Sequence, residues 1–480
     1  MVAELSSLEK TKATRSEFVD RFVRDILPNF PNKIRAINQC VNQLKEKLTR
    51  EKLDPETFPL PATIGDIDPW RLGFNRNNEP DPFEERYQNL SDKLALDPDG
   101  PNFLKLQAND REIRRRYKQR GIALTRYNPQ GGKGTEEVRN IVVEEAWQIG
   151  LKASSDQVWM GYGGGDLIER AARSVNVYFV QNFSRSAILL APSVGFSMAV
   201  EAIKDDQVNV KYLDNSDLPR NELTAERLAK YMEEDGSIPD MVLLTPANNP
   251  NAQSYDPENL RGFINQLLQI NKNAVFLFDM AYMWMIPRER AIKIMEVIKE
   301  TGAEQRAMFV NSLSKKTARP GSRLGSIIIL NPELGQIFHN DNMRHVASWS
   351  GDLDSLYQAL HITVDETAFS DLVEVFRQRQ KAMLDVLADL DPHHKYFKSL
   401  EITDQDVPLY LWVELQEGIT AFDILKDLNI GVVPSDAFGP EDGIGSDKNH
   451  IRISVGFAST SDILSFSPAT LQKWLANQTN

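Results

Sequence analysis

The densest group of chemically active side chains lies between residues 312 and 325. This segment reads SLSKKTARPGSRLG and combines serine hydroxyls, lysine amines and arginine guanidinium groups. Hydroxyl and guanidinium groups donate hydrogen bonds to phosphate, and a lysine amine becomes nucleophilic when burial or a neighbouring cation lowers its pKa. On its own, the segment is also consistent with a basic surface loop in front of the strand-like run SIIIL. Other segments are needed to decide between these interpretations.

Three further segments carry polar residues or glycines directly after strand-like runs. Asp279 and Tyr282 follow the run FLF, and a carboxylate at the end of a strand can keep a heteroaromatic ring nitrogen protonated. Asn249 lies in the turn LTPANNPN, and Gly164 and Gly165 lie in the turn MGYGGGD. Glycines at the start of a helix let the backbone approach a phosphate, which the helix dipole favours. Each motif alone also has an ordinary explanation as a turn.

Two more motifs complete the set. Arg452 lies in HIRISVGF, and its planar guanidinium group can hold a carboxylate by two parallel hydrogen bonds. Tyr127 lies in YNPQG. Taken in their order along the chain, the motifs resemble those of the class I/II aminotransferases, a family of pyridoxal 5'-phosphate (PLP) enzymes with the aspartate aminotransferase-like fold, fold type I. The resemblance covers roughly residues 125 to 457.

The resemblance implies that Lys315 bonds covalently to the aldehyde of PLP, and the preceding Ser-x-Ser favours Lys315 over Lys316. The implied cofactor contacts are Asp279 at the ring nitrogen, Asn249 and Tyr282 at the ring oxygen, and Gly164, Gly165, Ser312, Ser314 and Arg323 at the phosphate. Arg452 and Asn249 are expected beside the substrate, with Arg452 holding its α-carboxylate. Tyr127 is expected to reach the phosphate of a neighbouring subunit, which implies a homodimer.

The sequence departs from the family pattern at two places. Val194 stands where the family usually has an aromatic residue, so ring stacking worth about 0.5 to 1.5 kcal/mol is lost if Val194 contacts the cofactor, unless a reshaped turn brings in Phe196. Asn251 and Ala252 replace the family's Thr-Gly, which affects the shape of that turn. Arg344 has the spacing of the arginine with which dicarboxylate-specific members read the distal carboxylate of the substrate across the dimer, although an exposed helical arginine is the alternative.

The elements that position these residues alternate from about residue 136 onward. Helix-period segments separate short apolar runs of the kind found in strands buried on both faces. This pattern predicts an α/β fold, with a mostly parallel sheet sandwiched by helices and a smaller α+β domain formed by the C-terminal and N-terminal segments. We predict a helical arm and covering segment over 1–125, a large PLP-binding domain over 126–350 and a small domain over 351–480. The stretch 66–121 contains no motif that indicates a role.

Composition excludes several classes of protein. The 480-residue chain has a formal net charge of −13, which repels phosphate backbones and anionic lipid and therefore argues against nucleic acid and membranes as partners. Its single cysteine, Cys40, and its six histidines without an HExxH motif predict neither a disulfide framework nor a metal site. The sequence shows no signal peptide and no run long enough to span a membrane, which predicts a cytoplasmic protein.

Together, these features predict a homodimeric, PLP-dependent enzyme that acts at the α-carbon of an amino acid, with transamination as the expected reaction. The same motifs also serve lyases, cyclases, decarboxylases and oxidases, because these reactions begin with the same carbanion. A PLP-sensing regulator is a third alternative, but residues 1–60 show no clear DNA-binding unit. The sequence does not indicate which side chain the substrate carries.

Overall fold

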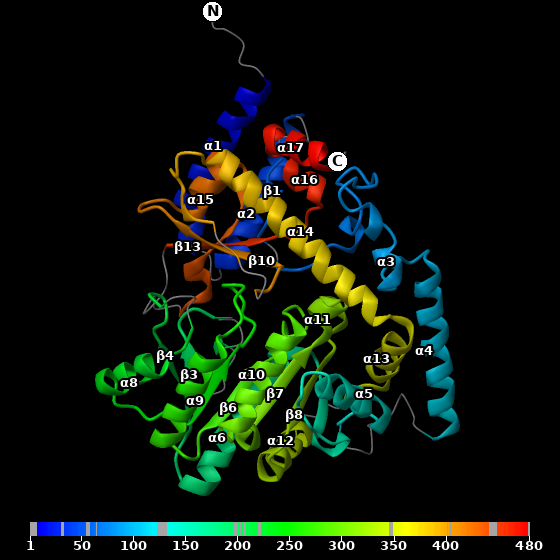
Figure 1. Ribbon diagram of the computed structural model, residues 1–480, viewed down its shortest axis with the longest axis vertical. Helices are drawn as coiled ribbons and strands as arrows, with labels where there is room; N and C mark the ends of the chain where they lie inside the picture. Colours follow the sequence, from blue (N-terminus) through cyan, green and yellow to red (C-terminus); the bar gives the residue numbers. More distant parts are fainter. Residues whose placement is uncertain are drawn as a thin grey trace, which may run out of the picture.

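The computed structural model is built around a seven-stranded sheet, which occupies the lower half of Figure 1. The structure describes residues 7–29, 33–53, 58–63, 65–121, 132–195, 200–201, 203–204, 208–218, 222–344, 349–400, 402, 406–440 and 449–478. The strands, in sheet order, are β2 (Val158–Gly161), β8 (Gly325–Ile329), β7 (Ala307–Ser312), β6 (Val275–Asp279), β5 (Met241–Leu244), β3 (Ile188–Pro192) and β4 (Asn209–Leu213). Strand β8 runs antiparallel to both neighbours, and the other adjacent pairs are parallel. The prediction of a mostly parallel sheet is therefore confirmed.

Helices cover both faces of this sheet, which explains why its central strands are continuously apolar. In β6, Val275 and Leu277 pack toward one face, whereas Phe276 and Phe278 pack toward the other. The first face is covered by α6 (Gly164–Phe183) and α12 (Pro332–Arg344). The second face is covered by α5 (Glu136–Trp147), α8 (Ala225–Glu234), α9 (Pro257–Ile270) and α10 (Arg288–Glu300). This arrangement is the predicted helix–sheet–helix sandwich.

A smaller antiparallel sheet forms the second part of the molecule. Its strands, in order, are β12 (Val433–Pro434), β13 (His450–Ser454), β10 (Tyr410–Leu415) and β9 (Phe397–Ser399). The long helix α14 (Glu366–Leu390) runs from the large sheet to this part (Figure 1). Helices α1 (Ser7–Asp25) and α2 (Lys33–Arg50) share a hydrophobic cluster with Val433 and Leu425. The N-terminal segment thus joins the small sheet, as predicted, while the exact domain borders stay predictions.

The segment between α2 and the large sheet covers the junction of the two parts. Its strand β1 (Leu60–Pro61) pairs in parallel with β11 (Ile430–Gly431), and its helix α4 (Pro101–Gln119) packs along α13 (Gly351–Thr363). The remaining helices are α3 (Leu90–Lys93), α11 (Leu313–Lys316), α15 (Ala421–Asp423), α16 (Thr460–Leu464) and α17 (Pro468–Gln478). Among the helices described, none is long and apolar enough to cross a membrane.

Candidate active site

The carboxyl ends of the parallel strands meet a cavity of about 500 Å³, which lies between the large sheet and the small sheet. Its lining includes Asn38, Gly65, Asp66, Gly164, Gly165, Glu169, Thr245, Asn249, Asp279, Tyr282, Ser312, Ser314, Lys315, Arg323, Tyr410 and Arg452. The motifs identified in the sequence contain all of these residues except Asn38, Gly65, Asp66, Glu169 and Tyr410. Segments that lie far apart in the sequence therefore converge on one site.

Lys315 projects into this cavity from α11, directly after β7. Ser312 ends the strand, and its hydroxyl oxygen accepts a hydrogen bond from the backbone N–H of Ser314 at 3.3 Å, which caps the short helix. The Lys315 ammonium group forms an ion pair with Asp66 of the covering segment. The lysine is only 16% exposed, so its amine is held at the cavity wall rather than in bulk water.

Lys316, the neighbouring lysine, points away from this cavity. Its Nζ lies 3.0 Å from Oε1 of Glu145 and 4.9 Å from the ring centroid of Phe369. It lines a different cavity of about 560 Å³, on the side of α5 and α14. Of the two adjacent lysines, only Lys315 therefore reaches the strand ends where the other predicted site residues gather.

Asp279 lies at the floor of the cavity, at the end of β6. Its carboxylate is buried, and burial raises its pKa to about 6, although a hydrogen bond from the backbone N–H of Ala281, 3.0 Å long, opposes this shift. No cation among the described residues pairs with this carboxylate. A protonated ring nitrogen would supply the missing positive partner.

Arg452 lies on β13, across the cavity from the large sheet. Its Nη1 donates to Oδ1 of Asn249 at 2.8 Å, and its Nη2 donates to the carbonyl oxygen of Thr63 at 2.9 Å. The guanidinium group lies 4.7 Å from the ring centroid of Tyr410, whose aromatic face stabilises the cation. Burial lowers the pKa of Arg452, and its Nε has no hydrogen-bond partner in the described residues. A carboxylate ligand would stabilise this buried cation.

Tyr282, which follows β6 of the large sheet, contacts Tyr410 on β10 of the small sheet. Their hydroxyl groups are 2.9 Å apart, and their rings meet edge to face with centroids 5.7 Å apart. Burial raises the pKa of Tyr282 well above its ordinary value, and the neighbouring Tyr410 adds to the shift. Tyr282 is therefore a neutral hydrogen-bond donor or acceptor at neutral pH.

The opposite end of the cavity is suited to a phosphate. Gly164 and Gly165 begin the 20-residue helix α6, so unpaired backbone N–H groups and the positive end of the helix dipole face the cavity. Gly163, before them, has a φ of 87°, and a Cβ atom there would lie 2.8 Å from Nη2 of Arg323. Arg323 donates to the carbonyl oxygen of Tyr162 at 3.2 Å, which holds its guanidinium group over this turn. Only glycine permits this close approach.

The turn after Asn249 stays tight although its sequence departs from the family pattern. Oδ1 of Asn251 accepts a hydrogen bond from the backbone N–H of Gln253 at 3.2 Å, and Ala252 adopts a φ of 64°. A left-handed conformation at this position is one that glycine adopts at lower cost than alanine. The substitution of Thr-Gly by Asn-Ala therefore leaves a tight turn, with Asn249 buried against Arg452.

Four residues that the sequence analysis considered are not among the described residues that line the cavity. Val194 is buried, donates its backbone N–H to Oδ1 of Asn215 at 2.8 Å and does not line the cavity. Tyr127 and Phe196 lie outside the described residues. Arg344 ends α12, and its side chain also lies outside the described residues. Their roles in the site stay predictions.

The residues missed by the sequence analysis come mainly from segments without a motif. Gly65 and Asp66 lie in the polar covering segment, Asn38 lies in α2 and Tyr410 lies in β10. Each looks like an ordinary helix, loop or strand residue locally. No local signal in the sequence marks these residues as members of the site.

The donor set of the cavity fits PLP. Asp279 is a buried carboxylate without a cation, the α6 glycines and the serine hydroxyls are phosphate donors, and Lys315 supplies an amine between them. Tyr282 follows Asp279 after β6, Asn249 follows the neighbouring strand β5, and all three line the same cavity. These residues are the ones that would hold the ring and the phosphate group.

Fold and site together define a protein of the aspartate aminotransferase-like class, with its site at the strand ends of a mostly parallel sheet. The chain belongs to the family "Aminotransferase class I and II", whose model matches residues 107–464. The predicted family is therefore confirmed. Enzymes of this family generally depend on PLP.

The individual relatives that the chain resembles are also aminotransferases. The chain is 26% identical over 204 residues to the LL-diaminopimelate aminotransferase of Aquifex aeolicus, a match that covers 40% of this chain and only 48% of that protein. The aspartate aminotransferase of Rhizobium meliloti is similar in structure, with a TM-score of 0.64 and 15% identity over 94% of this chain and 98% of its own. The aromatic aminotransferase of Pyrococcus horikoshii has a TM-score of 0.60 and 17% identity, over 81% and 99% of the two chains. These structural matches support the fold.

The buried carboxylate of Asp279 leads to a prediction for the cofactor-free protein. A folded pKa of about 6 exceeds the unfolded value of about 3.9, so the folded state binds more protons between these pH values, and stability falls as pH rises through this window. Asp279→Asn removes this titrating carboxyl group. We expect the variant to be more stable than the parent by up to roughly 3 kcal/mol above pH 7 and to lose this advantage near pH 4.

Urea unfolding of both proteins between pH 4 and pH 8 measures this difference. Asp99→Asn is the matched control, because it removes an exposed carboxylate instead of a buried one. A difference between Asp279→Asn and the parent that stays constant across the pH range would contradict the prediction.

Proposed function

We propose that the protein is a PLP-dependent aminotransferase, which converts an amino acid to its 2-oxo acid. The observation that carries the proposal is the convergence of Lys315, Asp279 and Arg452 on one cavity. Transamination needs an amine that moves a proton, a carboxylate that keeps a ring nitrogen protonated and a group that orients the substrate. These three residues supply all of them.

Each residue of the cavity has a separate role, which follows from its position. PLP, when bound, supplies an electron sink that stabilises a carbanion at the substrate's α-carbon. Arg452 binds the α-carboxylate by its planar guanidinium group and so fixes the orientation of the α-carbon. Nζ of Lys315 accepts the proton from that carbon and returns it later, so one amine acts as base and then as acid. Tyr410 and Phe438 pack against the Arg452 guanidinium group and keep it in place.

The proposal includes a homodimer in which Tyr127 of a second copy completes the phosphate site, and a cytoplasmic location. The family resemblance supports the dimer. The single cysteine supports a reducing compartment, because it allows no disulfide within the chain.

Single-turnover spectroscopy of the PLP-loaded protein tests the proposed reaction. We expect an amino acid, added without any oxo-acid acceptor, to convert the cofactor to pyridoxamine phosphate and to release one 2-oxo acid for each site. Regeneration of the starting absorbance with release of ammonia, carbon dioxide or a cyclised product would instead assign the protein to the lyases, cyclases or decarboxylases. Absence of any spectral change with all amino acids would contradict the proposal.

A further inference from the structure

We infer that Arg319 is a positioning residue for the phosphate group of PLP; this inference rests on the proposed function, which requires a phosphate site. The guanidinium group of Arg319 holds the turn of residues 319–323 in place, and this turn sets the position of Arg323. The family resemblance gives roles to Lys315 and Arg323, which lie on either side of Arg319, but none to Arg319 itself.

Arg323 needs such support because its side chain is exposed, so packing does not fix it. Two backbone carbonyl groups hold its guanidinium group. Nη2 donates to the carbonyl oxygen of Tyr162 at 3.2 Å, next to the glycine turn that begins α6, and Nη1 donates to the carbonyl oxygen of Pro320 at 3.1 Å. Pro320 belongs to the turn that Arg323 ends. The position of this turn therefore decides where the guanidinium group lies over the phosphate site.

Arg319 begins this turn and anchors it with both its main chain and its side chain. Its carbonyl oxygen accepts hydrogen bonds from the backbone N–H of Ser322 at 3.1 Å and from the Ser322 hydroxyl at 2.8 Å. Its Nη1 donates to the carbonyl oxygen of Leu94 at 2.9 Å, and its Nη2 donates to that of Ala95. Both acceptors belong to fully buried residues of the covering segment. Burial lowers the pKa of Arg319 to about 10, which indicates that these carbonyl groups take the place of water around the cation.

The lysine side of the segment has supports of its own. In α11, the backbone N–H and the hydroxyl of Thr317 donate to the carbonyl oxygen of Leu313 at 3.0 Å and 2.9 Å. The backbone N–H of Leu313 donates to the carbonyl oxygen of Leu324 at 3.0 Å, which closes the segment between β7 and β8. Nη1 of Arg319 adds a longer hydrogen bond, 3.3 Å, to the carbonyl oxygen of Thr317. Lys315 is therefore expected to keep its place when Arg319 is replaced.

The backbone around Arg319 is strained at three positions. Ala95, Ala318 and Arg323 each adopt a φ of 53°, in the left-handed region that is unfavourable for residues other than glycine. Such conformations persist where surrounding contacts hold them in place. Ala95 accepts a hydrogen bond from Arg319, Ala318 precedes it and Arg323 ends its turn. Loss of the Arg319 side chain is therefore expected to let the turn relax and to move Arg323.

Spectral titrations of the cofactor-free protein with PLP and with pyridoxal, which lacks the phosphate group, test this role by binding alone. In Arg319→Met, we expect the affinity for PLP to fall about 10- to 30-fold, because Arg323 loses its hold on the phosphate and hydrogen bonds between charged groups are the strong ones. The affinity for pyridoxal is expected to change by less than about threefold, because Lys315 and Asp279 stay in place. Arg319→Lys keeps the cation but has one nitrogen for two carbonyl groups, so we expect a loss of PLP affinity of about threefold.

Arg185→Met is the matched control for a general loss of stability. Arg185 pairs with the buried carboxylate of Asp240, with Nη2 2.6 Å from Oδ1, in front of β3 and thus at the end of the sheet opposite to the cavity. Its replacement is expected to lower the free energy of unfolding and to leave the preference for PLP over pyridoxal unchanged.

The preference for PLP over pyridoxal decides between the outcomes. An unchanged preference in a folded Arg319 variant, an equal loss of affinity for both ligands, or an equal loss of preference in Arg185→Met would overturn the role of Arg319. A parent protein that binds PLP no more tightly than pyridoxal would contradict the proposed function as well. A parent that binds PLP but transfers no amino group would contradict the proposed function alone.

Discussion

Lys315→Ala is expected to lower the rate of amino transfer by about 10³- to 10⁴-fold, because the variant loses the amine that moves the substrate's proton. The cavity around this position is otherwise formed mainly by residues of other elements, so its remaining walls stay in place. Single-turnover kinetics with saturating amino acid measure the loss. Reduction of the parent protein with borohydride is expected to fix PLP on the peptide that contains Lys315, and the variant is expected to show no such adduct.

Lys316→Ala is the matched control for this experiment. Lys316 stands next in the chain but pairs with Glu145, 3.0 Å away, outside the cavity. Its replacement is expected to change the rate by less than about threefold, because neither substrate nor cofactor reaches this side of α11. An adduct found on Lys316, or a Lys315→Ala variant with near-normal turnover, would refute the assignment of the cofactor-binding lysine and the mechanism built on it.

The sequence predicts the large-sheet half of the site well because that half is encoded locally. In an α/β sheet, catalytic residues follow the carboxyl ends of strands, so a buried apolar run ending in Asp279 or Ser312 indicates both the strand and the place of the side chain. The glycine turn carries a further local signal, because glycine is needed at Gly163, where Arg323 lies close to the backbone. Short motifs are sufficient for such residues.

The other half of the site depends on contacts between distant segments. Asp66 faces Lys315 only because β1 pairs with β11 and because Gly65 fits beneath Tyr410. The partners β11, Tyr410 and Lys315 all lie far from the covering segment in sequence, and the covering segment has no periodicity that fixes its path. The same reason applies to Val194, since its orientation is set by a hydrogen bond to Asn215, which local sequence does not reveal.

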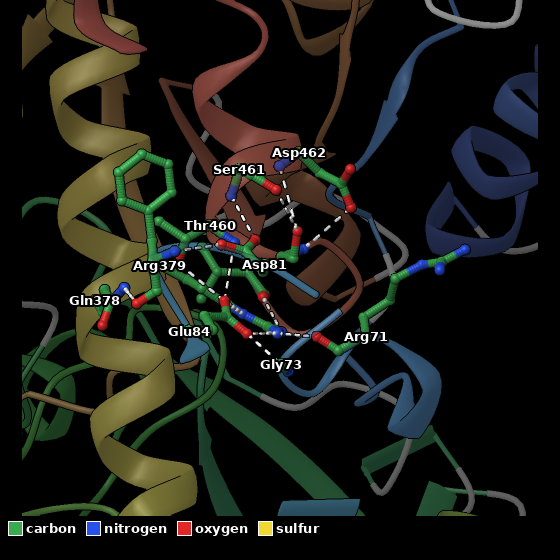
Figure 2. Close-up of polar contacts among 12 residues, drawn as sticks. Arg71, Gly73, Asp81, Glu84, Gln378, Arg379, Thr460, Ser461 and Asp462 are labelled. Carbon is green, nitrogen blue, oxygen red and sulfur yellow. Dashed lines mark hydrogen bonds and ion pairs between the residues drawn. The ribbon is translucent and has the colours of Figure 1, made fainter. Parts of the chain in front are cut away.

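The buried pair of Arg379 and Glu84 joins the covering segment to α14 (Figure 2). Both side chains are fully buried, and Nε and Nη2 of the arginine each lie 2.7 Å from a carboxylate oxygen. Glu84 also accepts hydrogen bonds from the backbone N–H and the hydroxyl of Thr460, both 2.8 Å long, and from the backbone N–H of Gly73. One carboxylate thus links three segments that are distant in sequence.

Arg379→Met is therefore expected to lower the free energy of unfolding by about 3 to 5 kcal/mol, because it leaves the charge of Glu84 buried without a cation. The double variant with Glu84→Gln is expected to recover part of this loss, since no unpaired charge then remains, although the amide replaces one of the acceptor oxygens that Thr460 and Gly73 use. Urea unfolding followed by tryptophan fluorescence measures the free energy of unfolding of the parent and both variants.

Lys230→Met is the matched control, because it removes an exposed ion pair to Glu234, 3.6 Å long, and is expected to cost less than about 1 kcal/mol. A loss in Arg379→Met no larger than in this control would show that the cluster does not anchor the covering segment.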